Sequence, residues 1–176
     1  MKDSLEEDWI SPEGYRCVVR LHHAAGHRMG YIFIPATDKA YVEPVYETYD
    51  MGGKEFTIMK YNEMYDIEVH GGLTYGEVNS DDKTYPATET RDGVWLGFDC
   101  AHCDDKPDFD AWEALYEEDD DKTALDMLRD VEDKVWTKTD TGDHRHMWTK
   151  QDVAEECNSM SRQIYIMTKG KLDEQD

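Results

Sequence analysis

The sequence predicts one α+β domain, in which C-terminal helices pack on an antiparallel or mixed sheet of about five strands. Two patterns support this prediction: apolar and polar residues alternate in several segments up to residue 100, and apolar residues recur at helical spacing after residue 111. The length of 176 residues is enough for one domain with its own core. Aromatic residues make up 11% of the chain and can fill that core.

Apolar and polar residues alternate in most of the predicted strands, because successive side chains of a strand point to opposite faces. The alternating segments are Tyr15–Leu21, Glu55–Met59, Asp66–His70 and Gly93–Cys100, and Met29–Ile34 is predicted as the strand that returns after a turn and ends at Pro35. Glycine pairs mark two of the intervening turns, at residues 52–53 and 71–72. The polar stretch at residues 76–92 is expected to be a loop.

The C-terminal half shows helical spacing instead. Two apolar stripes come first, formed by Trp112, Leu115 and Tyr116 and then by Leu125, Leu128 and Val131. The last helix has the clearest signals, because Thr149 is a suitable N-cap with Asp152 three residues later and Gly170 is suited to end a helix. A narrow apolar seam lies between them: Val153, Cys157, Met160, Ile164 and Met167. We expect this seam to pack on the sheet, and binding of a partner helix is the alternative.

The domain is expected to span residues 13–170, with a flexible acidic tail at residues 1–12 and a short tail at residues 171–176. The segment Met1–Asp8 is acidic and lacks the cationic start and apolar stretch of a signal peptide. The chain also lacks a run of about 18 apolar residues that could cross a bilayer. These features predict a cytoplasmic protein without a membrane partner.

Acidic residues give the chain a formal net charge of −22 and a pI near 4.5. Half of this charge lies in residues 104–133, which hold fourteen Asp or Glu against three basic residues. A phosphate backbone would be repelled over much of such a surface, so direct nucleic-acid binding is not expected. The acidic block is interpreted either as a solvated surface or as a mimic of nucleic acid that occupies a basic groove of a partner.

The first candidate site segment is Val69–Tyr75. His70 would end a strand before two glycines, where a ligand can approach the backbone closely. Histidine suits proton transfer near neutral pH or metal binding, and the hydroxyls of Thr74 and Tyr75 could hold a phosphate or a carbonyl oxygen. The alternative is an ordinary glycine turn that follows a structural histidine.

The second candidate segment is Gly97–Asp105, in which Asp99, His102, Asp104 and Asp105 lie within seven positions at the end of a predicted strand. This set suits a carboxylate that orients an imidazole, or a metal site with nitrogen and oxygen ligands. Cys100 and Cys103 form a CxxC pair, but the second half of a zinc site is missing, and buried thiols are the simpler interpretation. If the two strands are neighbours, the two segments meet.

At these motifs the chain resembles a family of small, mostly uncharacterised bacteriophage proteins. The resemblance rests on Gly30-Tyr31, on Val69–Tyr75 (VHGGLTY), on Gly97–His102 (GFDCAH) with a following aspartate, and on Asp152–Cys157 with Ser161-Arg162-Gln163. It implies phage origin, expression inside a bacterial cell and a role outside virion structure, without an established activity. The acidic stretch Glu117–Asp133 departs from the family pattern, which leaves any shared partner there in doubt.

The first function that these features suggest is a phage counter-defence protein in the cytoplasm of the infected bacterial host. It would bind or hydrolyse a host signalling nucleotide or a related phosphate ligand, by phosphodiester hydrolysis if it is an enzyme. Its catalytic residues would be His70, Asp99 and His102, and its ligand-binding residues Gly71, Gly72, Thr74, Tyr75, Arg16 and Arg20. A divalent metal is compatible with this site, because an acidic protein needs local positive charge to bind an anion. Homo-oligomerisation is also compatible with the sequence.

The second function is inhibition without catalysis. The acidic block would occupy the nucleic-acid channel of a basic host defence protein, as anti-CRISPR proteins of the DNA-mimic type do, and binding would weaken as salt rises. The sequence contains no P-loop, GxGxxG, GxSxG or HExxH motif, which excludes the easily recognised nucleotide-binding, hydrolase and protease signatures.

Overall fold

The computed structural model describes residues 4–78, 92–116, 119–136 and 144–173. In chain order its elements are β1 (Ser4–Ile10), β2 (Arg16–Leu21), β3 (Arg28–Pro35), β4 (Tyr46–Asp50), β5 (Glu55–Met59), α1 (Tyr61–Met64), β6 (Tyr75–Val78), β7 (Gly93–Asp99), β8 (Asp105–Lys106), α2 (Phe109–Glu113), α3 (Asp119–Trp136), β9 (His146–Met147) and α4 (Lys150–Asp173). The predicted strands that became β2, β3, β5 and β7 are confirmed to within two residues at each end.

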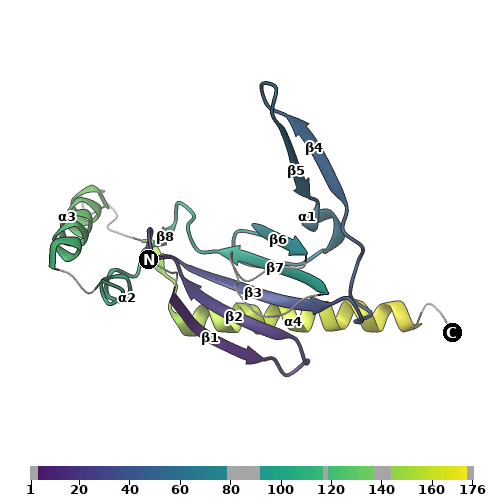
Figure 1. Cartoon of the computed structure of the whole chain (residues 1–176). Helices are drawn as coiled ribbons and strands as arrows, with labels where there is room; N and C mark the ends of the chain where they lie inside the picture. Colours follow the sequence, from purple (N-terminus) through teal and green to yellow (C-terminus); the bar gives the residue numbers. More distant parts are fainter. Residues whose placement is uncertain (1–3, 79–91, 117–118, 137–143, 174–176) are drawn as a thin grey trace.

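The central sheet has the strand order β1-β2-β3-β7-β6, and every neighbouring pair is antiparallel. Helix α4 runs across one face of this sheet and contacts β2 and β3 (Figure 1). The predicted α+β architecture, with an antiparallel sheet packed by a C-terminal helix, is therefore confirmed. Among the described helices, none has a stretch that is both long enough and apolar enough to cross a membrane.

The segment that was expected to be an acidic tail is instead the edge strand β1. It pairs with β2 from Ser4 opposite Leu21 to Ile10 opposite Arg16. Its acidic side chains match arginines of the sheet, since Asp8 lies 2.6 Å from Arg16 and Glu6 binds Arg28. At the other end of the chain, α4 continues past the predicted stop at Gly170 to Asp173; residues 174–176 of the predicted tail lie outside the described residues.

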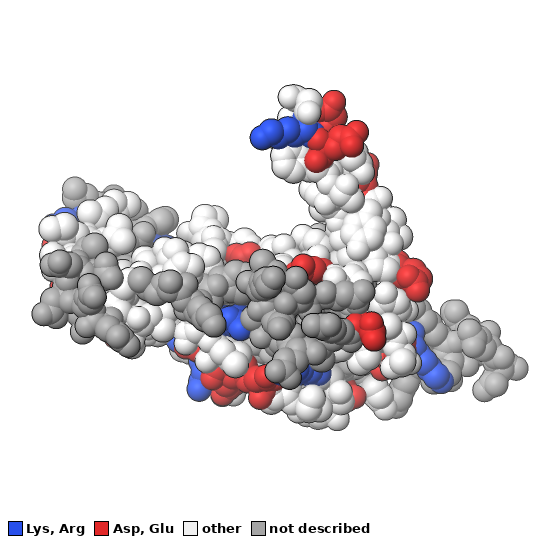
Figure 2. Space-filling model, viewed as in Figure 1, with Lys and Arg blue, Asp and Glu red and all other residues white. Residues whose placement is uncertain are grey.

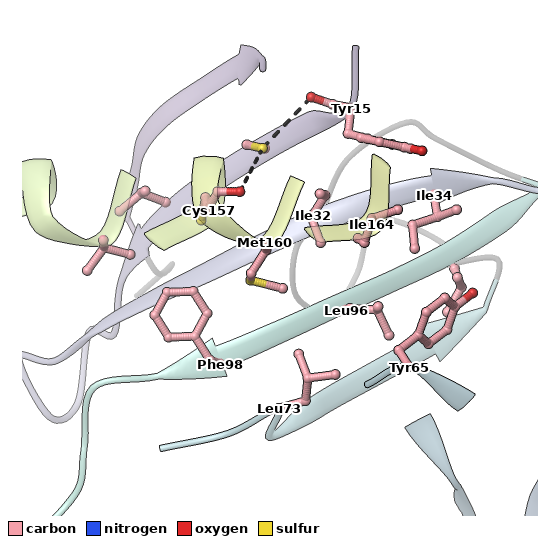
Figure 3. Packing of buried hydrophobic residues seen from close by; sticks show 14 of the residues in the cluster. Tyr15, Ile32, Ile34, Tyr65, Leu73, Leu96, Phe98, Cys157, Met160 and Ile164 are labelled. Carbon is pink, nitrogen blue, oxygen red and sulfur yellow. Dashed lines mark hydrogen bonds between the residues drawn. The ribbon is translucent and has the colours of Figure 1, made fainter. Parts of the chain in front are cut away.

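The main core lies between the sheet and α4. The helix contributes the predicted seam, of which Val153, Cys157, Met160 and Ile164 are fully buried and Met167 is partly buried. Figure 3 shows Cys157, Met160 and Ile164 among the core side chains. Burial of each valine, methionine or isoleucine side chain in this seam stabilises the fold by roughly 1.5–3 kcal/mol. Gly30 permits this close packing, because a Cβ atom there would lie 2.4 Å from the Phe98 ring and 2.8 Å from the Cys157 sulfur. The seam is therefore part of the core, as expected, and not a surface for a partner helix.

The helix begins as its sequence predicts. The Thr149 backbone N–H donates to Asp152 Oδ2 at 2.8 Å, and the Asp152 backbone N–H donates to Thr149 Oγ1 at 3.2 Å. This reciprocal pair is a capping box, which satisfies two N–H groups at the first turn of the helix. The capping box therefore fixes the backbone position of Trp148, the residue directly before the N-cap.

The predicted strand at Asp66–His70 is wrong. Its backbone pairs with a side chain instead of a strand: the Glu68 N–H donates to Gln163 Oε1 at 2.9 Å, and Gln163 Nε2 donates to the Glu68 carbonyl at 2.7 Å. The amide of Gln163 thus takes the place of a neighbouring strand at this point. Strand pairing begins only at Tyr75, where β6 joins β7.

Strands β4 and β5 form a separate hairpin that projects from the body of the protein (Figure 1). Nearly all of its residues are exposed, including the apolar side chains of Tyr49, Phe56 and Ile58. Acidic side chains gather with a basic one at its tip on the face drawn in Figure 2. A two-stranded hairpin is only marginally stable by itself in water, so we expect this hairpin to be the least stable part of the sheet structure.

Helices α2 and α3 lie at the opposite end of the sheet from the C-terminus (Figure 1). Phe109, Trp112 and Leu125 form a small buried cluster between them. The predicted stripe of α3 is only partly buried, because Leu128 and Val131 are exposed. Part of the acidic block, residues 117–118, lies outside the described residues.

Candidate functional site

Asp105 lies at the centre of the candidate site. It belongs to β8, which pairs in parallel with β9 so that Asp105 lies opposite His146. Its side chain is only 1% exposed, yet both of its oxygens are satisfied. Oδ2 accepts the His102 backbone N–H at 2.9 Å, and Oδ1 accepts the indole N–H of Trp148 at 2.9 Å. A buried carboxylate with this many donors is held in one orientation.

Two imidazoles meet at this carboxylate. Nε2 of His70 lies 2.8 Å from Asp105 Oδ2, and Nδ1 of His102 lies 3.2 Å from the same oxygen. The two rings are nearly perpendicular, with their centroids 5.0 Å apart. Their side chains are 24% and 34% exposed, so solvent reaches both rings. We call these three residues the His70–His102–Asp105 cluster.

The glycine turn lets the two segments come this close. Gly71 and Gly72 have φ values of 65° and 84°, and the Gly72 N–H donates to the Val69 carbonyl at 2.9 Å. A Cβ atom on Gly71 would lie 1.9 Å from Cε1 of His102, so any larger residue would displace that ring. Glycine is therefore required at position 71 for both the backbone conformation and the position of His102.

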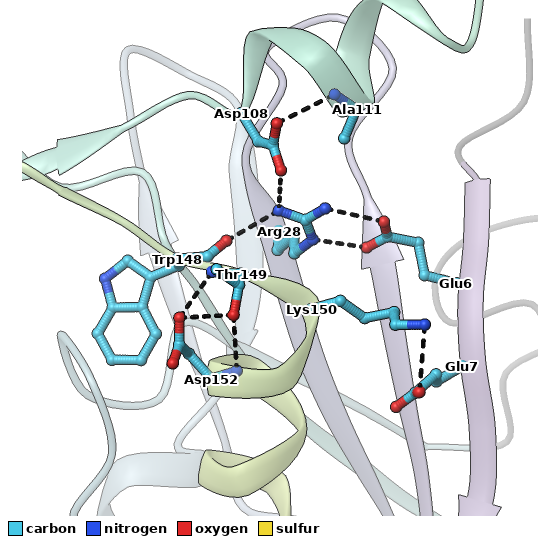
Figure 4. A network of polar contacts seen from close by, with 9 residues as sticks. All are labelled: Glu6, Glu7, Arg28, Asp108, Ala111, Trp148, Thr149, Lys150 and Asp152. Atoms are coloured by element: carbon cyan, nitrogen blue, oxygen red, sulfur yellow. Dashed lines mark hydrogen bonds and ion pairs between the residues drawn. The ribbon is translucent and has the colours of Figure 1, made fainter.

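Trp148 closes one side of the cluster. Its ring lies 4.2 Å from the His70 ring, centroid to centroid, while its N–H binds Asp105. Its carbonyl accepts a hydrogen bond from Arg28 at 2.9 Å, and Figure 4 shows the indole pointing away from that contact. The same arginine binds Glu6 and Asp108. Trp148 is thus held at both its backbone and its side chain.

The surroundings of Asp105 keep its carboxyl group ionised. Burial alone would raise the pKa of Asp105, but the hydrogen bonds from His70 and His102 outweigh it and lower that pKa below its ordinary value. Burial raises the pKa of Glu156, against an opposite effect of nearby His70. Asp105 is therefore ionised at neutral pH, which suits a carboxylate that orients two imidazoles.

A shallow hollow of about 320 Å³ adjoins the cluster at Trp148. Its other lining residues are His146, Asp152, Glu155 and Glu156. His146 Nε2 lies 3.6 Å from Asp152 Oδ2, and the His146 ring packs edge-on against Trp148. Three carboxylates therefore border the space beside the cluster, which disfavours an anion and favours a cation there.

Comparisons with protein-family models, with curated proteins and with solved structures give no match to this chain. The chemistry of the site therefore has to be argued from its own geometry. The cluster offers two oriented imidazoles for proton transfer, or three ligand atoms for a metal, all within 4.8 Å of one another. Within the described ranges, no other group of His, Cys, Asp and Glu converges in this way.

The structure brings together the two predicted histidines, but with a different carboxylate. Asp99 ends β7 opposite Met29 in β3, and its Oδ1 accepts the Ala101 N–H at 3.1 Å. The expected role of Asp99 beside the imidazoles is filled by Asp105. Cys100 is buried while Cys103 is exposed, so the CxxC pair does not form a two-thiol site.

The predicted ligand-binding residues divide between the cluster and other places. Gly71 and Gly72 form the turn beside His102, whereas the Tyr75 ring packs edge-on against Tyr31 and its hydroxyl binds Glu77. The Thr74 side chain is exposed, and its N–H donates to Gly97. Tyr75 thus faces the small core cluster of Val18, Met29, Tyr31, Phe33 and Trp95.

The two predicted arginines belong to β2. Nε and Nη2 of Arg16 donate to the two carboxylate oxygens of Asp8 in the edge strand, at 2.9 and 2.6 Å. Arg20 is 8% exposed and lies opposite Met29 in the sheet. Neither position adjoins the cluster in the strand register, so a contact with the ligand remains a prediction for both.

Sequence reasoning missed Trp148 and Glu156 as members of the site. Trp148 is separated from Asp105 by 43 residues, and nothing in its local pattern indicates the contact. The one available signal was its place directly before the N-cap of the last helix, which fixes the position of that residue. Asp105 was within the second motif, but the spacing did not distinguish it from Asp99 or Asp104.

Proposed function

We propose that the protein binds a small phosphate-containing ligand at the His70–His102–Asp105 cluster and hydrolyses a phosphodiester bond of it. The observation that carries this proposal is that two solvent-accessible imidazoles share one buried carboxylate oxygen. In the reaction, water would attack phosphorus, a new P–O bond would form, and the bond to the leaving ester oxygen would break. The cluster would activate the water and supply a proton to the leaving oxygen, each contributing roughly 10²–10⁴-fold.

The biological setting proposed is counter-defence by a phage in the cytoplasm of the infected bacterial host. The resemblance of the VHGGLTY and GFDCAH segments to phage proteins supports the setting, and both segments contribute a histidine to the cluster. Host signalling nucleotides are the proposed ligand class, because they contain a phosphodiester bond and would be present in the infected cell. Destruction of the signal would then protect the phage.

The test is to incubate the purified protein with cyclic and linear dinucleotides and with cyclic mononucleotides, and to follow the products by chromatography. We expect hydrolysis of at least one of them, and a loss of about 10²–10⁴-fold in rate for His70→Ala and for His102→Ala. His144→Ala is the matched control, because His144 is exposed in the segment before β9 and should leave the rate unchanged. Equal rates in all variants would exclude the cluster as the site, and binding without products would replace hydrolysis by sequestration.

A second function is favoured by one observation on α3. This helix exposes a continuous apolar stripe at helical spacing, in which Met127, Leu128, Val131 and Val135 are 65, 48, 57 and 57% exposed. Residues 119–136 also carry seven acidic against three basic residues. An apolar helix face with acidic flanks fits an apolar groove rimmed by basic residues, so inhibition of a basic host protein is the alternative function.

The two functions separate in a phage plating assay in which the host expresses the protein. If α3 inhibits a host protein, Met127→Ser with Val131→Ser should abolish protection, because a helix that binds in a groove is anchored by its apolar face. Tyr46→Ser with Ile58→Ser removes two equally exposed apolar residues from the β4–β5 hairpin and is the matched control. Retained protection in the α3 variant, together with its loss in His70→Ala, would eliminate inhibition.

A further inference from the structure

We propose that Nε2 of His70, Nδ1 of His102 and Oδ2 of Asp105 coordinate one divalent transition-metal ion, of which Zn²⁺ is the best match. The inference rests on the proposed function only for what the ion would bind, namely a phosphate oxygen and the attacking water. The coordination itself is argued from donor types, distances, supporting contacts and charge.

The donor set is the first argument. Imidazole nitrogens and a carboxylate oxygen are the ligands of catalytic zinc sites that contain two His and one carboxylate. Ligand atoms at 2.0–2.1 Å from a tetrahedral ion lie about 3.3 Å from one another. The two nitrogens lie 2.8 and 3.2 Å from Asp105 Oδ2, and all three atoms lie within 4.8 Å. Small rotations of the half-exposed rings would bring the nitrogens to coordination distance.

The supporting contacts are the second argument. Ligands of metal sites are usually oriented by hydrogen bonds from residues behind them. Here the Trp148 indole N–H binds Asp105 Oδ1, and it leaves Oδ2 as the oxygen that faces the imidazoles. The His102 backbone N–H also binds Oδ2, and an ion that replaces the two imidazole contacts would use the other lone pair of this oxygen. Gly71 leaves room for the His102 ring.

Charge is the third argument. An anionic ligand needs positive charge, but two arginines near the N-terminus are engaged with carboxylates: Arg16 with Asp8, and Arg28 with Glu6 and Asp108. Arg28 donates to the carbonyl of Trp148, which contacts the cluster, but the Arg28 side chain is only 5% exposed and cannot reach a bound ligand readily. The carboxylates of the adjoining hollow would repel a phosphate and attract a cation. A divalent ion at the cluster would reverse this local field.

Three protein ligands leave a fourth position open on a tetrahedral ion. Both imidazoles are partly exposed, so that position faces solvent, where water or a phosphate oxygen can bind. Zn²⁺ lowers the pKa of a bound water to about 7, far below that of bulk water. The ion would therefore provide the nucleophile and the positive charge that the proposed hydrolysis requires, and the proton released by the bound water would pass to the leaving ester oxygen.

The test is titration of the chelator-treated full chain with zinc chloride, followed by calorimetry. We expect one ion per chain, and a loss of affinity greater than about 100-fold for His102→Ala and for Asp105→Asn, because even supporting residues contribute 10–100-fold. Trp148→Phe should lower the affinity by about 10–100-fold while the three ligands remain. His144→Ala and Cys103→Ser are controls for adventitious sites and should bind as the wild type does.

Absence of binding by the wild type would overturn the inference, and so would unchanged affinity in a folded His102→Ala variant, with folding checked by circular dichroism. The proposed function is tested separately from the metal site. Hydrolysis that persists in chelator would exclude a role for the metal in the reaction and would support hydrolysis by the cluster itself. Stoichiometric zinc binding without binding or hydrolysis of any nucleotide would support the metal site and exclude the proposed hydrolysis.

Discussion

Replacement of Arg28 by methionine should lower the free energy of unfolding by about 3–5 kcal/mol, because removal of one partner leaves buried charges unpaired. The guanidinium is 5% exposed and lies between Glu6 and Asp108, whose side chains are 16 and 15% exposed. It also donates to the carbonyl of Trp148 (Figure 4). Methionine would keep much of the volume and remove all of these contacts. Urea-induced unfolding at pH 7 measures the change.

The matched control for this variant is Arg16→Met. Arg16 also binds an acidic residue of β1, but its side chain and that of Asp8 are 29 and 30% exposed. Solvent-exposed ion pairs contribute about 0–1 kcal/mol, so this variant should unfold close to the wild type. Equal losses in the two variants would show that burial does not distinguish the two pairs.

Replacement of Asp105 by alanine should lower the free energy of unfolding by about 3 kcal/mol in chelator, since hydrogen bonds to a charged group contribute about 1.5–3 kcal/mol each and do not add fully. The variant leaves the Trp148 indole and the His102 backbone N–H without their acceptor. Asp104→Ala is the matched control, because Asp104 is exposed and surface substitutions usually change stability by less than about 0.5 kcal/mol.

The effect of Asp105 should depend on pH in a defined direction. Its pKa in the folded protein is lower than the ordinary 3.8, so the unfolded chain binds the proton more readily. The stabilisation by Asp105 is thus present above that value and decreases as pH falls through the folded pKa. The difference between wild type and Asp105→Ala should shrink as pH falls below 3.8. A difference that grows over that acidic range would contradict the assignment.

Much of the fold follows from local patterns, and the errors have physical causes. In β7 the apolar residues Leu96 and Phe98 recur at every second position because this face of the strand lies in the core shared with α4, and the capping signal at Thr149 needs only nearby residues. Strand β1 was misread because its acidic residues suggest a solvated tail, whereas Glu6 is matched by Arg28 from another strand. The segment at Asp66–His70 has a strand pattern, but the side-chain amide of Gln163 forms hydrogen bonds with the backbone N–H and carbonyl of Glu68 in place of a neighbouring strand.

The candidate site was predictable only in part. Each histidine lies next to turn or acidic residues in the sequence, and this placement indicated His70 and His102 without showing their common partner. The alternating pattern places Asp99 at the end of β7, but it does not show which carboxylate reaches the histidines. Asp105 reaches them because a turn lets its Oδ2 accept the His102 backbone N–H. Trp148 joins from a distant segment, so only the tertiary fold could reveal it.

The edge strand is connected to the cluster by a short chain of contacts. Glu6 of β1 holds Arg28, Arg28 donates to the carbonyl of Trp148, and the indole of Trp148 holds Asp105. Local opening of an edge strand and occupancy of a neighbouring site are then linked equilibria, and such linkage acts equally in both directions. A ligand on the cluster should slow amide hydrogen exchange in β1, and a chain that begins at residue 13 should bind that ligand less tightly although every site residue is retained.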